Sequence, residues 1–327
     1  MTRSAHIGRV LSALLLAVGL VAVAESLAWR GARFPGFFVM PNRVVPSVGL
    51  PGWSGVGEGR PLYQQVVLAV DGAKAGDAAD VYRAVALHRA GTDVEYMVAR
   101  EGAVESRLLP PRTFGAGEYV AIFGMYLVCG IFYLALAVLA VERRAAAPAL
   151  HGGLAALAWV GAAFALTAMD LYGPGRLFRL HAAAEALLPA AFVHLALVCP
   201  GDRVRGRPGL LPLVYGVGIA LAAVYQVLLY EPRAYTVVHD VCQALIVPPA
   251  FAVAIMLALA LSDPPSTLGA RGTRRLLGGT LVGIVAPAIV LGISGASGGR
   301  VPVNASAWVS FVFPLAAILS LRAPARS

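Results

Sequence analysis

Charged residues are scarce in this 327-residue sequence, and lysine is almost absent. Asp, Glu, Lys and Arg make up 13% of the chain, whereas hydrophobic residues make up 59% and the mean hydropathy is +0.76. Soluble domains contain about 25% charged residues, so the composition excludes an ordinary soluble protein and indicates a polytopic membrane protein. Lys74 is the single lysine. The use of arginine in its place, together with abundant Ala, Gly, Val and Leu, is typical of a GC-rich bacterial genome.

Cysteine is also rare. Cys129, Cys199 and Cys242 each lie inside an apolar run, and none has a second cysteine at CxxC spacing. This pattern excludes a disulfide framework and a cysteine zinc site. We expect all three to be small hydrophobic residues packed between helices.

Motifs that carry catalysis are missing as well. The sequence has no P-loop, no dinucleotide fingerprint and no kinase nucleotide site. The stretch 181–185 reads HAAAE, which is not the His-Glu-x-x-His of an intramembrane metalloprotease. The stretch 292–295 reads GISG and matches the Gly-x-Ser-Gly of rhomboid proteases, but no histidine follows His239 to serve as its partner. We therefore predict that the chain is not an enzyme and has no catalytic residues, metal or cofactor.

The long apolar runs that are present predict a helical membrane protein. A first run covers residues 7–29, and seven more lie at 118–141, 147–169, 181–200, 210–230, 236–261, 276–296 and 305–321. About 20 apolar residues in a helix cross the ~30 Å hydrocarbon core of a bilayer. The predicted fold class is thus a polytopic α-helical membrane protein with about eight transmembrane helices, one before and seven after a polar insert.

The net charge of +9 lies mainly in short loops, which predicts the topology. Arginines follow the second, fourth, sixth and eighth runs, at Arg143, Arg144, Arg203, Arg205, Arg207, Arg271, Arg274, Arg275, Arg322 and Arg326. Such loops remain cytoplasmic, and because these four alternate along the chain they can all be cytoplasmic together. Both termini are then predicted in the cytoplasm of a bacterial inner membrane, with residues 30–114 outside. This distribution also argues against nucleic acid as a partner.

Aromatic residues near the predicted outer helix ends agree with this topology. Rings are favoured at the membrane interface, and six of them fall at these ends, namely Trp29, Tyr119, Tyr172, Tyr230, Tyr235 and Trp308. The stretch 34–38, which reads FPGFF, is expected to lie along the same interface.

The chain divides into four predicted parts. Residues 1–29 are a transmembrane anchor or a signal peptide, because Ala22-Val23-Ala24 matches a signal-peptidase site while the apolar run continues to Trp29. We favour the uncleaved anchor. Residues 30–114 are an extracytoplasmic domain, residues 115–323 are the seven-helix domain, and residues 324–327 are a cytoplasmic tail.

Residues 30–114 have the pattern of a small α+β domain. A strand at 66–70 ends in Asp71-Gly72, a helical stretch follows at 78–89, and Gly91 precedes two strand-like stretches joined at Gly102. This order resembles the second half of a bacterial PDZ domain, a family that often captures extended peptides by strand addition. The resemblance implies a peptide or an envelope protein as a partner. However, the family's Gly-Leu-Gly-Phe loop is not evident, and the stretch 48–52 (VGLPG) is a poor substitute.

The wider arrangement resembles the N-terminal sensor half of certain bacterial membrane histidine kinases. An anchor, an external PDZ-like domain and seven helices occur in that order, and the stretches 192–200 (FVHLALVCP) and 313–318 (FPLAAI) look like recurrent patterns of those sensors. The resemblance implies a cytoplasmic signalling output. That output is expected to be absent from this chain, either as a missing domain or as a separate partner.

Ionisable residues gather near the predicted outer helix ends. They are Glu118, Asp170, Arg176, His181, Glu185, Glu231, Arg233, His239 and Asp240. His181 and Glu185 are four residues apart on one helix face. Because ionisable groups in a membrane are costly and often functional, we predict that His181, Glu185, His239 and Asp170 form one cluster beneath residues 30–114. Such a set can bind a small ligand, a proton or a metal ion, and the alternative is a set of interfacial residues in contact with water.

These observations leave three functions open. The first is a non-catalytic sensor that relays an external signal to a cytoplasmic output. The second is a scaffold whose PDZ-like domain, marked by Asp71, Gly72, Gly91 and Gly102, binds a partner. The third is a transporter, which the apolar mid-span positions disfavour because His194 and Gln243 are rare polar exceptions. Gly279 and Gly283 have the GxxxG spacing of close helix packing, expected inside the chain, with a homodimer as the alternative.

Overall fold

The computed structural model describes residues 3–55, 61–89, 91–100, 102–143 and 147–322. The predicted tail at 324–327, Arg144 and Arg326 lie outside the described residues. Within them, eight helical segments are long and apolar enough to cross a membrane: Val10–Leu27, Ala116–Glu142, Pro148–Leu171, Phe178–Val198, Leu210–Leu228, Pro232–Leu259, Gly269–Ala296 and Val303–Leu321. The chain is a multi-pass helical membrane protein, and the eight predicted spans are confirmed.

The first span is one helix, α1 (Arg3–Leu27), and the fourth, fifth and sixth are α7 (Phe178–Val198), α8 (Leu210–Leu228) and α9 (Pro232–Leu259). The second is α3 (Ala116–Tyr119) with α4 (Met125–Glu142), and the third is α5 (Pro148–Ala156) with α6 (Ala158–Leu166). The seventh is α10 (Gly269–Thr280) with α11 (Ala286–Ala296), and the eighth is η4 (Val303–Ser306), α12 (Ala307–Ser310) and α13 (Val312–Arg322).

Three spans contain a π-helical turn. These turns are η1 (Val120–Gly124), η2 (Thr167–Leu171) and η3 (Leu281–Val285), in the second, third and seventh spans. A π-helical turn rotates the residues beyond it relative to those before it, and such turns are frequent at functional sites. Sequence periodicity gave no indication of them.

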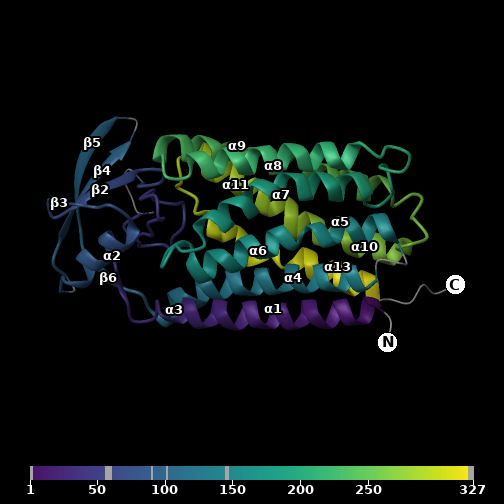
Figure 1. Cartoon of the computed structure of the whole chain (residues 1–327), viewed down its shortest axis with the longest axis horizontal. Coiled ribbons are helices and arrows are strands. Elements are labelled where there is room, and N and C mark those ends of the chain that lie inside the picture. The colour runs from purple at the N-terminus through teal and green to yellow at the C-terminus, as the bar shows by residue number, and fades with distance from the viewer. Residues whose placement is uncertain (1–2, 56–60, 90, 101, 144–146, 323–327) are drawn as a thin grey trace.

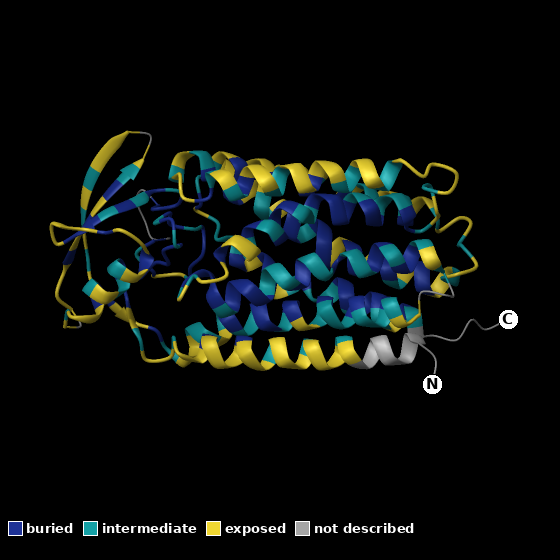
Figure 2. Ribbon diagram, viewed as in Figure 1, coloured by how far each residue is buried: buried dark blue, intermediate teal, exposed yellow. Residues whose placement is uncertain are grey.

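Six of the eight spans close into a ring. Around it, α4 packs on α6, α6 on α7, α7 on α9, α9 on the seventh span, α10 on α13, and α13 again on α4. The remaining two spans lie outside, with α1 against α4 and α8 against α7 and α9. Both outer helices are largely exposed (Figure 2), with only 11% of each apolar window buried. Their exposed leucines and valines fit a lipid environment, because lipid tails are as apolar as these side chains.

The two ends of the molecule differ. Residues 30–114 cover one end of the helices, whereas the start of α1, the end of α13 and the loops α4–α5, α7–α8 and α9–α10 lie at the other end (Figure 1). Those loops and that helix end carry the arginine clusters identified in the sequence. The polar domain and the arginine clusters of these loops are therefore at opposite ends, as the alternation of loops predicts.

Residues 30–114 form a small α+β domain. Strands β2 (Val66–Val70), β3 (Ala73–Lys74), β4 (Val94–Arg100) and β5 (Ala103–Leu109) make an antiparallel sheet in the order β3-β2-β4-β5. Helix α2 (Ala78–Ala86) packs on β2, and a short pair, β1 (Arg33–Phe34) with β6 (Arg112–Thr113), brings the ends of the domain together. Alternate residues of β4 point into the domain core, as the period of two predicts.

The predicted turn after the first long strand is a two-residue hairpin loop. Asp71 and Gly72 both have positive φ, at 46° and 76°, and they join the Val70–Ala73 pair of β2 and β3. This is the Asp-Gly chemistry that a type I′ turn requires. The Asp71 carboxylate accepts the backbone N–H of Glu95 at 3.0 Å and pairs with His88 Nε2 at 2.7 Å, so one residue holds together the turn, β4 and the segment that follows α2.

Aromatic residues join the domain to the helices. Phe34 and Phe38 are fully buried, and Phe38 stacks on Tyr172 with ring centroids 4.2 Å apart. Trp29, at the end of the first span, packs edge-on against Phe38 and Tyr82. The expectation that residues 34–38 lie along the membrane interface is wrong, because these rings fill the contact between the domain and the bundle.

The six aromatic residues predicted at the interface divide into two groups. Tyr172 and Tyr235 are buried and belong to the core, whereas Trp29 and Tyr119 are partly buried and Tyr230 and Trp308 are about half exposed. The sequence cannot separate these groups, because both lie at helix ends of the same composition.

Candidate functional site

A cavity of about 200 Å³ lies inside the helix ring, beneath residues 30–114. The second, third, fourth, sixth, seventh and eighth spans all contribute to its wall, and the segments 40–48 and 63–64 of the polar domain form its roof. None of its lining residues is exposed on the surface. The inner end is lined by apolar and aromatic side chains such as Tyr133, Val160, Phe192 and Ile246, and the end near the roof is polar.

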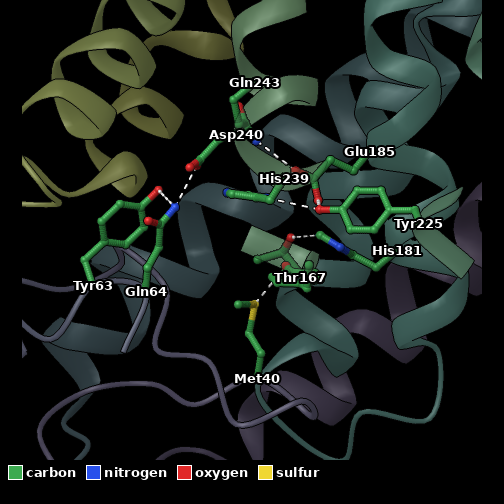
Figure 3. A network of polar contacts seen from close by, with 11 residues as sticks. Met40, Tyr63, Gln64, Thr167, His181, Glu185, Tyr225, His239, Asp240 and Gln243 are labelled. Atoms are coloured by element: carbon green, nitrogen blue, oxygen red, sulfur yellow. Dashed lines mark hydrogen bonds and ion pairs between the residues drawn. The ribbon is translucent and has the colours of Figure 1, made fainter. Parts of the chain in front are cut away.

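A buried carboxylate organises the polar end. Glu185, on α7, is 3% exposed and accepts hydrogen bonds from three side chains on neighbouring helices (Figure 3). His239 Nδ1 lies 2.6 Å from Glu185 Oε1, Gln243 Nε2 donates to the same oxygen at 3.0 Å, and Tyr225 donates its hydroxyl to Oε2 at 3.1 Å. Charge inside a membrane protein needs such partners, and here they tie α7 to α8 and α9.

A second polar contact lies one helical turn away. Thr167, in η2, donates its hydroxyl to the Ala163 carbonyl at 2.8 Å and lies 3.0 Å from His181 Nε2. Since the only hydroxyl proton of Thr167 is used in the first bond, His181 Nε2 must be the donor in the second. The Nδ1 atom of His181 is buried and has no hydrogen-bond partner in the described part of the chain.

The roof contacts the polar end through two residues of the external domain. Gln64, whose φ is +60°, donates its side-chain amide to Asp240 on α9 at 2.7 Å and to the Tyr63 hydroxyl at 3.1 Å. Burial, and then the nearby carboxylates of Asp240 and Glu185, raise the pKa of Tyr63 well above its ordinary value. Tyr63 is therefore a neutral hydroxyl at any physiological pH, and it can donate a hydrogen bond.

The structure brings three of the four residues of the predicted cluster to one place. His181, Glu185 and His239 all line the cavity. Asp170 does not, because its two oxygens accept the backbone N–H groups of Arg176 and Leu177 at 2.8 and 2.6 Å, directly before α7. The expectation that Asp170 belongs to the cluster is wrong, since the carboxylate is used to organise the turn that begins the fourth span.

The other predicted polar residues have separate positions. Arg176 is exposed, and its backbone takes part in the Asp170 turn. Arg233, on α9, is exposed and lies close to the β4–β5 turn, with its guanidinium 3.4 Å from where a Cβ on Gly102 would be. Asp240 holds the roof through Gln64. Across the residues that the structure describes, no group of three or more His, Cys, Asp or Glu residues is placed to bind a metal ion.

Sequence reasoning missed several residues of the site. Tyr225 and Thr167 had no distinguishing pattern, because isolated Tyr and Thr residues are ordinary in membrane helices. Gln243 was noted as a rare polar residue within a span, and that rarity was the usable signal. Tyr63 and Gln64 belong to an irregular segment whose position over the helices depends on tertiary packing.

No protein-family model matches this chain, and neither does any curated protein or solved structure. Its function is therefore inferred from the cavity and the residues around it.

Buried hydrogen bonds hold the roof on the bundle. Asn304, in η4, accepts the Gly49 N–H at 3.0 Å and donates to the Gly49 carbonyl at 3.1 Å. The Val303 N–H donates to the Ser47 carbonyl at 2.7 Å, and the Ser47 and Ser294 hydroxyls are 2.9 Å apart. On the other side, Asn42 donates to the Leu229 carbonyl at 2.9 Å. The roof is thus fixed at the ends of several spans.

Replacing Asn304 with leucine is expected to loosen the roof. The substitution leaves both backbone groups of Gly49 without a partner in a buried place, at a cost of about 1–3 kcal/mol for each group. Hydrogen–deuterium exchange of residues 44–53 should become faster, while exchange in the β4–β5 hairpin stays unchanged. Ser297→Ala is the control, because the Ser297 hydroxyl bonds to the carbonyl of Ser294 in the same turn. Equal exchange in Asn304→Leu and the control would contradict this role of Asn304.

Proposed function

We propose that this chain is a membrane sensor module that binds a small ligand in the cavity beneath residues 30–114. The observation that carries the proposal is the shared wall of that cavity, to which six spans and the external domain contribute residues. A ligand held there contacts every member of the ring. Its binding free energy can therefore favour one packing of the ring over another, which is the requirement for a ligand to shift a conformational equilibrium.

The signal in this proposal travels along the spans to the end that carries the basic loops. That end faces the cytoplasm of a bacterial inner membrane, with residues 30–114 outside, because short arginine-rich loops remain on the cytoplasmic side. A signalling output acts there, as in the membrane histidine kinases that the arrangement resembles. The module itself is not an enzyme in this proposal.

In this proposal the external domain has a PDZ-like fold and covers the cavity. The Asp71-Gly72 turn, the position of α2 and the hairpin that turns at Gly102 support that fold. Capture of a peptide terminus would need free loop amides at 48–52. The Gly49 N–H in that stretch already bonds to Asn304. This contact favours a covering role for the domain over the role of a scaffold that binds peptides.

A transporter is less well supported than a sensor. Transport needs a polar path through the centre of the bilayer. Below the cavity, the ring is filled by a cluster of buried hydrophobic residues that includes Leu136, Leu154, Leu195, Val253 and Phe313.

The proposal is tested by filling the cavity and measuring the far end of the bundle. Ala163 lines the cavity from α6, so Ala163→Phe should occupy part of the space that the ligand takes. Spin labels at Glu142→Cys and Ser262→Cys, two exposed positions at the end of α4 and just after α9, report the distance between two spans of the ring. We expect Ala163→Phe to change the distribution of distances between the labels, by the ~1–2 Å typical of helix shifts in signalling proteins.

The control places the same side chain outside the ring. Ala223 is on the exposed face of α8, so Ala223→Phe should leave the distances unchanged. Identical distributions for Ala163→Phe, Ala223→Phe and the unmodified chain would contradict the proposed coupling. The native cysteines are all buried, which keeps background labelling low.

A further inference from the structure

The side chains that line the cavity indicate which chemical class of ligand it binds. We infer that it binds a small, uncharged amphiphile, with a head that donates hydrogen bonds to His181 and Gln243 and an apolar body directed toward the middle of the bundle. The inference rests on the proposed function, since it names the class of ligand for the same cavity.

Two buried acceptors without partners belong to residues that line the polar end. His181 donates through Nε2 to Thr167, so in the neutral ring its Nδ1 carries a lone pair. Gln243 donates through Nε2 to Glu185, which leaves its Oε1 as an acceptor. Both atoms are buried, and neither has a hydrogen-bond partner in the described residues. Buried polar groups are nearly always paired in native proteins, so this pair of acceptors indicates a donor from outside the chain.

His239 is the third hydrogen-bonding residue at the polar end. Its Nδ1 lies 2.6 Å from Glu185 Oε1, which fixes a proton on Nδ1. In the charged pair with Glu185, the other ring nitrogen, Nε2, also carries a proton and can donate a hydrogen bond to the ligand. In Figure 3 this nitrogen points away from Glu185, toward Tyr63 and Gln64 of the roof. The side chain is 24% exposed, and the residue lines the cavity.

The same contacts disfavour a charged head. An anionic head accepts hydrogen bonds and cannot donate them, so it does not satisfy the acceptors of His181 and Gln243. A cationic head needs a carboxylate, but both oxygens of Glu185 already accept from His239, Gln243 and Tyr225. Moving a charge into the bilayer region is also costly unless it is paired. A neutral hydroxyl or amide group is the head that fits.

The size and the inner wall of the cavity define the body of the ligand. Aromatic and aliphatic side chains, including Tyr133, Phe164, Phe192 and Ile284, line the deeper part. The volume is about 200 Å³, somewhat larger than the ~150 Å³ engineered cavity that holds benzene. The expected ligand therefore has on the order of ten non-hydrogen atoms, as in an alkylphenol, and is much smaller than a phospholipid.

The test compares three probes that share one aromatic body. 4-Ethylphenol donates a hydrogen bond, 4-ethylanisole has only an acceptor, and 4-ethylbenzoate is an anion. Binding to the purified full chain in lipid nanodiscs is measured by calorimetric titration, with empty nanodiscs subtracted to remove partitioning into lipid. We expect saturable binding of 4-ethylphenol, about tenfold tighter than that of 4-ethylanisole because one or two hydrogen bonds are lost, and no binding of 4-ethylbenzoate.

Variants locate the binding. Gln243→Met keeps the shape of the side chain and removes the acceptor, so the affinity for 4-ethylphenol should fall about tenfold. His181→Phe should have a similar effect and serves if Gln243→Met does not fold. Gln226→Leu is the control, because Gln226 lies on α8 outside the cavity and bonds to Arg179. Its affinity should be unchanged.

Three outcomes would overturn the inference: no saturable binding of 4-ethylphenol, equal binding of 4-ethylphenol and 4-ethylanisole, or tighter binding of 4-ethylbenzoate. These outcomes are separate from failure of the proposed function. If Ala163→Phe still shifts the labelled helix ends, the sensor proposal stands and only the class of ligand is wrong. If Ala163→Phe has no effect, the coupling itself is wrong, whatever the probes do.

Discussion

Replacing Gly283 with leucine is expected to disrupt the helix ring as strongly as any single change considered for this chain. Gly283 lies in η3, against the start of α13, where a Cβ would come within 2.8 Å of Phe313 Cβ and even closer to the Phe313 backbone nitrogen. A backbone atom cannot move aside as the end of a flexible side chain can. The two spans would have to separate, at a cost of about 3 kcal/mol or more. The midpoint of thermal unfolding in detergent should fall sharply, and less of the purified chain should be monodisperse.

A neighbouring glycine provides the matched control. Gly278 is on the same span and is exposed, and a Cβ there would meet nothing within 4 Å. Gly278→Leu should leave the stability unchanged or raise it by about 0.5–1 kcal/mol, because leucine is the better helix former. If both variants unfold at the same temperature, close packing at Gly283 does not limit stability. Gly279 and Gly283 of the GxxxG spacing both face α13 of the same chain, and a homodimer stays a separate prediction.

Replacing Glu185 with leucine is expected to have an effect of similar size. The change removes the acceptor for His239, Gln243 and Tyr225 at once, and it leaves their donors buried between α7, α8 and α9. Removal of one partner from a buried charged pair costs about 3–5 kcal/mol. The unfolding midpoint of the purified chain should therefore fall, and binding of 4-ethylphenol should weaken because the Glu185 contacts no longer orient His239 and Gln243.

Two substitutions separate charge from hydrogen bonding in this prediction. Glu185→Gln keeps a carbonyl acceptor but loses the charge, so its cost should be lower, on the order of 1–3 kcal/mol. Glu142→Gln is the control for a carboxylate in an exposed position at the end of α4, and its effect should stay within about 0.5 kcal/mol. A Glu185→Leu variant as stable as Glu142→Gln would show that the buried network contributes nothing to the packing of α7, α8 and α9.

The membrane spans were the most predictable feature of the fold. The fifth run was predicted at 210–230 and forms Leu210–Leu228, and the sixth was predicted at 236–261 and forms Pro232–Leu259. This agreement has a simple cause. A backbone segment in hydrocarbon must satisfy its own hydrogen bonds, which leaves the helix as the available structure for an apolar run of that length. The Asp71-Gly72 turn was similarly readable, because few residue pairs accept positive φ at two successive positions.

The candidate site was only partly predictable. The spacing of His181 and Glu185 placed both on one helix face, but His239 is on a different helix, and the meeting of α7 with α9 depends on how the helices pack. Asp170 shows the limit of composition as a guide, since a carboxylate near a helix end can face a cavity or accept backbone N–H groups. Here it does the second, at 2.8 and 2.6 Å. The two uses have the same local sequence signal.

By itself, the sequence determined the features that depend on single segments. The number of spans, their approximate ends, the separation of the arginine loops from the polar domain and the hairpin turns all follow from hydropathy, charge and local conformational preference. These quantities act over one helix length or one turn, so they can be read along the chain.

Only the tertiary structure decided which residues meet. It put α1 and α8 outside and the other six spans in a ring, and it used Phe34 and Phe38 to join the polar domain to the bundle. It also brought His181, Glu185, His239 and Gln243 from two helices to one cavity beneath residues 30–114. Apolar helices in lipid are equivalent in hydropathy, so their order is set by close contacts, such as Gly283 against Phe313, and by buried hydrogen bonds across spans.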